Sequence, residues 1–251
     1  MTLFVVLLLV HVVADFYLQP YSWIMDKVQY KAKSLGLLKH IGVHTVLTGL
    51  ALFFVTGSYE NKLLIALAII VLTHYAIDIW KTHMGFTTKF FVMDQLAHII
   101  IIALVSAWLS GNSLKTFQDL IVNGFEIKYL LWLTAYALAF KPLSILIQLI
   151  LRPYTEQIDT EKNHGLQTAG EHIGALERIL VITFVLLGQY AGIGFLLAAK
   201  SVFRFGDMRR EHDRKLTEYI MLGTLLSFTF ALLIGLVAVA VSATDFALQN
   251  H

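Results

Sequence analysis

Residues 90–109 read FFVMDQLAHIIIIALVSAWL and are almost entirely apolar. An apolar helix of about 20 residues is long enough to cross a bilayer. Similar segments fall at 2–19, 35–57, 62–81, 129–151, 175–199 and 219–243. Open sheet edges cannot survive in hydrocarbon, so these segments should all be helical. The sequence therefore predicts an all-α polytopic bundle of roughly six to seven spanning helices, with short interfacial helices between them.

The composition fits a membrane protein. Of the 251 residues 57% are hydrophobic and only 14% are charged, whereas soluble domains carry about a quarter charged residues. The net charge of +2 does not suggest a nucleic-acid partner, and the absence of cysteine excludes thiolate metal sites. We expect a multi-pass protein of the bacterial inner membrane. Whether it forms a homo-oligomer stays open.

The chain is expected to have two halves. Residues 1–112 should form a four-helix half, and residues 113–251 a second membrane half with a basic loop at 200–215. Amphipathic stretches at 20–34 and 114–127 suit interfacial helices. The basic loop is a candidate site for an anionic lipid or a protein partner. Its basic residues are Lys200, Arg204, Arg209, Arg210, Arg214 and Lys215.

Membrane orientation raises a conflict. Lysines lie between the first two segments and between the third and fourth, which places both loops on the cytoplasmic side by the positive-inside rule. Simple alternation through seven spans would put the basic loop at 200–215 on the opposite side. One span is therefore misassigned. The suspects are the segment around Pro142 and the segment with Gly188, Gly192 and Gly194.

Ionisable residues recur in pairs inside the apolar segments. His and Asp make up 19 of the 251 residues, and random placement would give about 1.4 pairs at spacing i, i+4. Four such pairs occur, and residues four apart share one face of a helix. They are His11 with Asp15, His40 with His44, His74 with Asp78, and Asp94 with His98.

All four pairs should lie at one depth. The first and third pairs are near the C-terminal ends of their segments, and the second and fourth are near N-terminal ends. In an up-down bundle these ends face the same side of the membrane. The eight side chains should therefore form one layer, about one or two helical turns below the surface.

Five imidazoles and three carboxylates form a nitrogen and oxygen ligand set. Such a set suits zinc or manganese, and about two or three divalent ions could share it. The three aspartates are also candidate catalytic bases. Polar contacts that hold the helices together remain the structural alternative.

Nearby polar residues extend the predicted site. Lys39 and Lys81 are candidate catalytic residues that could meet a phosphate, and Gln95 could orient a ligand. The remaining lysines of the first loop, Lys27, Lys31 and Lys33, are expected to reach into the headgroup region.

The four motifs HVVADFYLQ (11–19), LLKHIGVH (37–44), HYAIDIWK (74–81) and FVMDQLAH (91–98) resemble a family of bacterial integral membrane proteins catalogued as domain of unknown function 3307. The resemblance covers roughly residues 1–110 and implies no particular activity. A looser similarity in pattern is to membrane-bound metal-dependent hydrolases.

Three functions stay open at this point. The first is a membrane-embedded metal-dependent hydrolase acting on a lipid or lipid-linked, phosphate-containing substrate. The second is a transporter of divalent metal or protons, which would need polar groups through the whole membrane. The third is a non-catalytic membrane module with a structural polar core. The runs VLTGLALFFV, LLIALAIIVL and IIIIALVSAWL contain no ionisable groups and favour a one-sided pocket.

Overall fold

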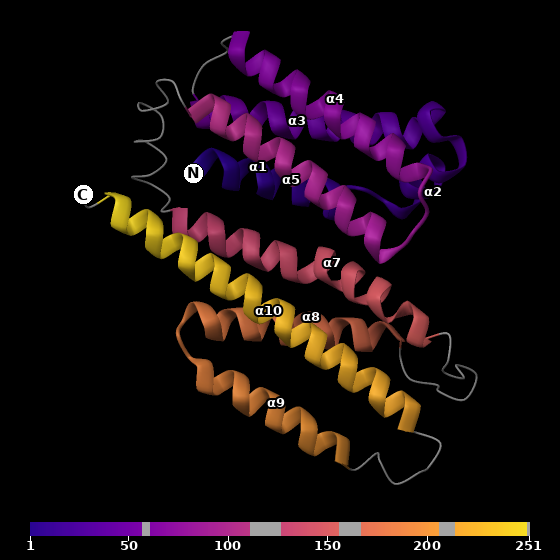
Figure 1. Cartoon of the computed structure of the whole chain (residues 1–251), viewed down its shortest axis with the longest axis vertical. Helices are drawn as coiled ribbons and strands as arrows, with labels where there is room; N and C mark the ends of the chain where they lie inside the picture. The colour runs from indigo at the N-terminus through magenta and orange to yellow at the C-terminus, as the bar shows by residue number, and fades with distance from the viewer. Residues whose placement is uncertain (57–60, 111–126, 156–166, 206–213, 250–251) are drawn as a thin grey trace. The chain divides into compact units, whose positions relative to one another are not determined.

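The computed structural model describes residues 1–56, 61–110, 127–155, 167–205 and 214–249, and in these residues it contains helices and no strands (Figure 1). The predicted all-α fold is confirmed. The predicted interfacial helix at 114–127 lies outside the described residues, apart from its last position. The helices are α1 (Thr2–Val12), α2 (Tyr21–Tyr30), α3 (Leu35–Thr56), α4 (Asn61–Thr82), α5 (Thr88–Ser110), α7 (Ile127–Thr155), α8 (Gln167–Leu186), α9 (Tyr190–Phe205) and α10 (Arg214–Gln249).

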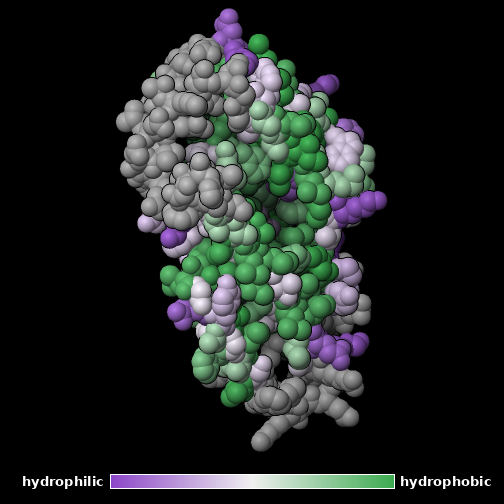
Figure 2. Space-filling model, turned by 60° about the vertical axis from the view of Figure 1, so that its left-hand side comes forward, coloured by the Kyte–Doolittle hydropathy of each residue, from purple (hydrophilic) through white to green (hydrophobic). Residues whose placement is uncertain are grey.

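The chain is a membrane protein by the length and apolarity of its helices. Among the described residues, α3, α4, α5, α7 and α10 qualify as spans, and a bent pair made of α1 and α2 would raise the number to six. Hydrophobic side chains also dominate much of the described surface in Figure 2. The chain divides into two compact units, Met1–Ala137 and Leu138–His251. Their boundary lies inside α7, later than the expected boundary at residue 112.

The first unit contains a closed four-helix arrangement. Helix α1 packs on α3 and α5, and α4 packs on the same two helices. Each helix buries one stripe of residues spaced three or four apart, as core-facing helices do. Toward one end of the helices these stripes are apolar and form a single cluster. Its buried members are Leu3, Leu7, Ala51, Leu52, Val55, Leu63, Ala66, Ile70, Ile102, Val105 and Leu109.

The chain bends sharply after α1. A π-helical turn, Val13–Tyr17, follows α1, and the amide of Leu18 donates to the carbonyl of Val13 at 3.0 Å. Pro20 then precedes α2, whose axis turns by 84° from the preceding helix. A 3₁₀ turn, Lys31–Lys33, follows α2 and contacts α3 and α4. Residues 21–33 therefore cover one end of the four-helix arrangement, and we call them the cover segment.

The corner between α2 and α3 fixes the cover segment. The Asp26 carboxylate accepts hydrogen bonds from the Ser34 hydroxyl and from the Gly36 amide, the latter at 2.7 Å. The Ser34 hydroxyl accepts a bond from the Leu37 amide at 2.8 Å and so caps the start of α3. A Cβ atom on Gly36 would lie 2.9 Å from the Cα and carbonyl oxygen of Trp23. The two helices therefore approach too closely here for any residue except glycine.

We expect Gly36→Ala to destabilise the detergent-purified protein by about 1–3 kcal/mol, because the added methyl group meets backbone atoms that cannot move independently. Thermal unfolding measures the effect. Gly42→Ala is the matched control, since Gly42 lies on the same helix and a Cβ atom there would have no neighbouring atom within 4 Å. Alanine should be neutral or stabilising at that position. Equal melting temperatures for the two variants would contradict the close contact with Trp23.

In the second unit, the segment expected to span at 175–199 is two helices. Helix α8 ends at Leu186, Gly188 adopts a positive φ of 68°, and α9 begins at Tyr190. Lys200 Nζ lies 2.6 Å from Glu177 Oε2, so α9 runs back along α8 as a hairpin. Helix α7, the other suspect, continues through Pro142. The segment at 175–199 is therefore not a single span, as its glycines suggested.

A buried arginine joins three helices of the second unit. Arg178 on α8 donates from Nε to the carbonyl of Ala139 at 2.6 Å and from Nη2 to the carbonyl of Phe140 at 3.3 Å. Its Nη2 also bonds the hydroxyl of Ser144, and its Nη1 bonds that of Ser227 on α10. Arg178 is thus a packing anchor with its donors engaged.

Candidate metal centre

The structure brings all eight residues of the predicted His/Asp layer together. His11 comes from α1 and Asp15 from the π-helical turn, while α3, α4 and α5 each contribute one pair. Seven of the eight residues are buried, and the Asp15 side chain is 10% exposed. The pairs lie at the opposite end of the helix stripes from the apolar cluster. We call these eight residues the His/Asp centre.

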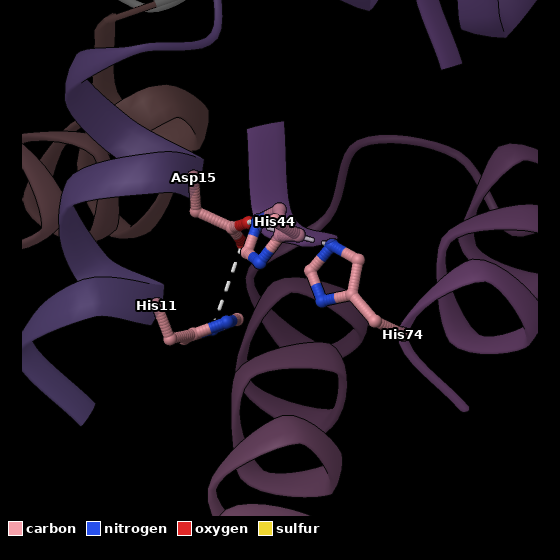
Figure 3. Close-up of side chains that lie close together, drawn as sticks. All are labelled: His11, Asp15, His44 and His74. Atoms are coloured by element: carbon pink, nitrogen blue, oxygen red, sulfur yellow. Dashed lines mark hydrogen bonds and ion pairs between the residues drawn. The ribbon is translucent and has the colours of Figure 1, made fainter. Parts of the chain in front are cut away.

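One group of potential ligands converges on Asp15 (Figure 3). Asp15 Oδ1 lies 2.8 Å from Nε2 of His44 and 3.6 Å from Nε2 of His74. Its other oxygen, Oδ2, lies 3.7 Å from Nε2 of His11. All four side chains therefore point toward one small volume, and each supplies one ligand atom within 4.8 Å of the others.

Two further groups of potential ligands each share a residue with another group. His40, His74 and Asp78 form the second group, and Asp78, Asp94 and His98 form the third. His74 thus belongs to the first and second groups, and Asp78 to the second and third. The three groups are continuous, as in centres where neighbouring ions share ligands.

Two of the separations between ligand atoms, both around His40, are close to the edges of a metal coordination polyhedron. Bonds of about 2.0–2.1 Å in a tetrahedral zinc site place neighbouring ligand atoms about 3.3–3.4 Å apart. His40 Nε2 lies 3.2 Å from His74 Nε2 and 3.3 Å from Asp15 Oδ1. It also lies 3.6 Å from Asp78 Oδ2. Most of these contacts are longer than ordinary N–H···O hydrogen bonds, whose usual range is about 2.7–3.2 Å.

Several buried ligand atoms have no hydrogen-bond partner. Among the described residues these include Nε2 of His11, Nε2 of His98 and Oδ1 of Asp94. Asp94 Oδ1 and His98 Nε2 lie 3.6 Å apart and face each other. Buried polar groups are normally satisfied, so unpaired atoms that converge indicate a missing partner. The donor set and these atoms together fit a divalent metal ion.

Comparison with known proteins supports the family resemblance. Residues 3–123 match the sequence model of a family described as protein of unknown function (DUF3307). The N-terminal part of the chain is a DUF3307 region. No curated protein and no solved structure matches the chain. The comparisons therefore do not show the looser likeness to metal-dependent hydrolases.

The DUF3307 region places two lysines in contact with the His/Asp centre. Lys27 Nζ donates to Asp78 Oδ2 at 2.8 Å, and only 10% of the Lys27 side chain is exposed. The expectation that Lys27 extends into the headgroup region is therefore wrong. Lys81 pairs with Asp94 Oδ2 and is 27% exposed.

The other predicted neighbours differ in their placement. Gln95 donates to Asp94 Oδ2 at 3.0 Å and to Asp15 Oδ2 at 3.4 Å, so it joins two of the ligand groups. Lys39 is exposed, although its neighbour His40 is buried. The structure therefore does not bring Lys39 into the His/Asp centre. Lys27, which sequence reasoning missed, takes the place that Lys39 was expected to fill.

Proposed function

We propose that the chain is a membrane-embedded metal-dependent hydrolase of the bacterial inner membrane, acting on a lipid or lipid-linked substrate. The proposal rests on one observation. Eight potential ligands from α1, its π-helical turn, α3, α4 and α5 converge in three linked groups, and several of their buried ligand atoms have no hydrogen-bond partner among the described residues. We infer that the groups hold two or three zinc or manganese ions, as roughly four ligands per zinc ion would allow with shared residues.

The ligand chemistry supports hydrolysis. Divalent ions held by these histidines and aspartates would lower the pKa of a bound water, and a pair of ions would stabilise the negative charge that develops during hydrolysis. In the proposed reaction the water oxygen bonds to the electrophilic atom of the substrate, and the bond to the leaving oxygen breaks. Asp15, if it is not itself bound to an ion, is our candidate for the base that takes the proton from water. Its side chain is 10% exposed, against 4% for Asp78 and 1% for Asp94.

The position of the centre favours a lipid linkage as the substrate. His40 and His44 lie in the first turns of α3, and Asp78 lies in the last turns of α4. The centre therefore lies toward one end of helices that qualify as membrane spans, which supports a position near the headgroup level. A scissile bond near a lipid headgroup would lie at that depth.

The apolar half of the bundle argues for a pocket and against a transport path. Beyond the centre, the buried stripes of the four helices form the apolar cluster that contains Leu52, Ile70 and Ile102. A path for ions would need polar groups or water through this layer. The unpaired atoms also argue against a purely structural polar core, which would satisfy its own hydrogen bonds.

Metal analysis of the detergent-purified chain tests the proposal. After reconstitution, mass spectrometry should find about two or three equivalents of zinc or manganese. The metal-loaded protein should release headgroup or phosphate products from bacterial lipid extract, as followed by ³¹P NMR. A chelator should stop the release, and Asp15→Asn should lower the rate by about 10²–10⁴-fold if Asp15 is the base.

His83→Ala is the matched control for histidine replacement. His83 follows α4, is exposed, and bonds the carbonyl of Ile79 at 2.9 Å, outside the His/Asp centre. The His83→Ala variant should keep both metal and activity. Monodisperse wild-type protein without metal above background would overturn the proposed function.

A further inference from the structure

We propose that Lys27 and Lys81 form an anion subsite of the His/Asp centre that binds a phosphate group. This inference rests on the proposed function and specifies how its substrate is recognised. Both ammonium groups already lie on carboxylates of the third ligand group, Lys27 on Asp78 and Lys81 on Asp94. Ligand atoms of Asp78 and Asp94 lie within 4.8 Å of each other, so both lysines border the same small volume.

The formal charges of the centre explain why an anion is required. With neutral imidazoles, the formal charges of the three carboxylates and the two ammonium groups sum to −1. Metal ligands must be deprotonated, so neutral imidazoles are the appropriate state. Two divalent ions would change the sum from −1 to +3. A net charge of this size is costly among buried groups in a membrane helix bundle, and an anionic ligand would offset it.

Metal ions would also displace the lysines from their present partners. Asp78 Oδ2 is the atom that Lys27 contacts, and the same oxygen faces His40 at 3.6 Å and His74 at 3.9 Å. An ion bound by this oxygen would repel the ammonium group of Lys27. The two lysines would then be held at the centre without full compensation. An anion placed between the ions and the lysines would be attracted to both.

Phosphate is the anion that best fits this arrangement. A phosphate group offers several oxygens, so it can contact metal ions on one side and ammonium groups on the other. Lys81 is the more exposed lysine at 27%, against 10% for Lys27. The phosphate would therefore enter from the side of Lys81, and Lys27 on the cover segment would contact it from the buried side.

Calorimetric titration of the metal-loaded, detergent-purified chain tests the subsite. The two probes are inorganic phosphate and a non-hydrolysable short-chain phosphonolipid. We expect Lys27→Gln and Lys81→Gln each to weaken binding of at least one probe by about tenfold or more, since each removes a charge-assisted hydrogen bond. Metal content should stay at the wild-type value. Lys33→Gln, in the same cover segment but exposed, should bind both probes like wild type.

The two probes separate the sources of the phosphate. Tighter binding of the phosphonolipid assigns the subsite to a lipid headgroup, and tighter binding of inorganic phosphate assigns it to a free phosphate group. Because Lys81 is partly exposed, Lys81→Gln keeps the test decisive if Lys27→Gln fails to fold. Unchanged affinity for both probes in a metal-loaded lysine variant overturns the subsite alone. Wild-type protein that takes up no metal overturns the subsite and the proposed function together.

Discussion

Replacing His74 with alanine is expected to remove metal from two ligand groups at once. His74 is shared by the first and second groups, whereas His98 belongs only to the third. His74→Ala should therefore lose more metal equivalents than His98→Ala under the same reconstitution. Its metal affinity should fall by more than the roughly 10–100-fold that loss of an outer-shell partner costs. Mass spectrometry after gel filtration gives the stoichiometry of each variant.

A graded loss of metal would separate a shared centre from independent sites. His83→Ala, outside the centre, should keep the wild-type stoichiometry and serves as the control. Equal losses in His74→Ala and His98→Ala would contradict the sharing of His74. If the eight residues formed only a structural core, both variants would lower the melting temperature and no metal would be present to lose.

The His/Asp centre could be predicted from the sequence because two simple periodicities determine it. Spacing i, i+4 places each pair on one face of a helix. Up-down alternation of the spans then brings the C-terminal end of α4 beside the N-terminal ends of α3 and α5. No knowledge of side-chain packing is needed for either step. The result is that all eight predicted ligands fall in the three groups.

The two lysines at the centre were harder to predict because they depend on tertiary geometry. Lys27 reaches Asp78 only because the chain turns by 84° after α1 and packs closely at Gly36. Hydropathy contains no information about that turn. The choice of Lys39, in contrast, could have been avoided from sequence alone. Consecutive helical residues do not face the same way, so a buried His40 places Lys39 elsewhere.

The break between α8 and α9 shows a limit of averaging hydropathy. Residues 175–199 are apolar enough to look like one span, and the window hides a reversal at Gly188. The glycines identified this segment as suspect. In a single straight helix Lys200 and Glu177 would lie far apart. Their contact could therefore be recognised only from the structure.

In the metal-free protein, Asp78→Asn is expected to lower the free energy of unfolding by about 3–5 kcal/mol, because it leaves the buried Lys27 ammonium without its partner. Lys27→Met should also destabilise, since it leaves the Asp78 carboxylate buried without a counter-charge. The double variant should lose less than the sum of the two, with a coupling free energy of about 0.5–3 kcal/mol. Denaturant unfolding of chelator-treated protein in detergent measures all three, with Lys33→Met as the exposed control.

Metal should change this cycle in a characteristic way. A bound divalent ion compensates the Asp78 carboxylate, so Lys27→Met should cost less stability in metal-loaded protein than in metal-free protein. Asp78→Asn should then cost more, because it removes a ligand as well as a counter-charge. If the two substitutions had additive effects on the free energy of unfolding, within about 0.5 kcal/mol and with or without metal, the interaction between Lys27 and Asp78 would contribute nothing to stability. The cover segment would then be held by its other contacts, which include those of Asp26, Ser34 and Gly36.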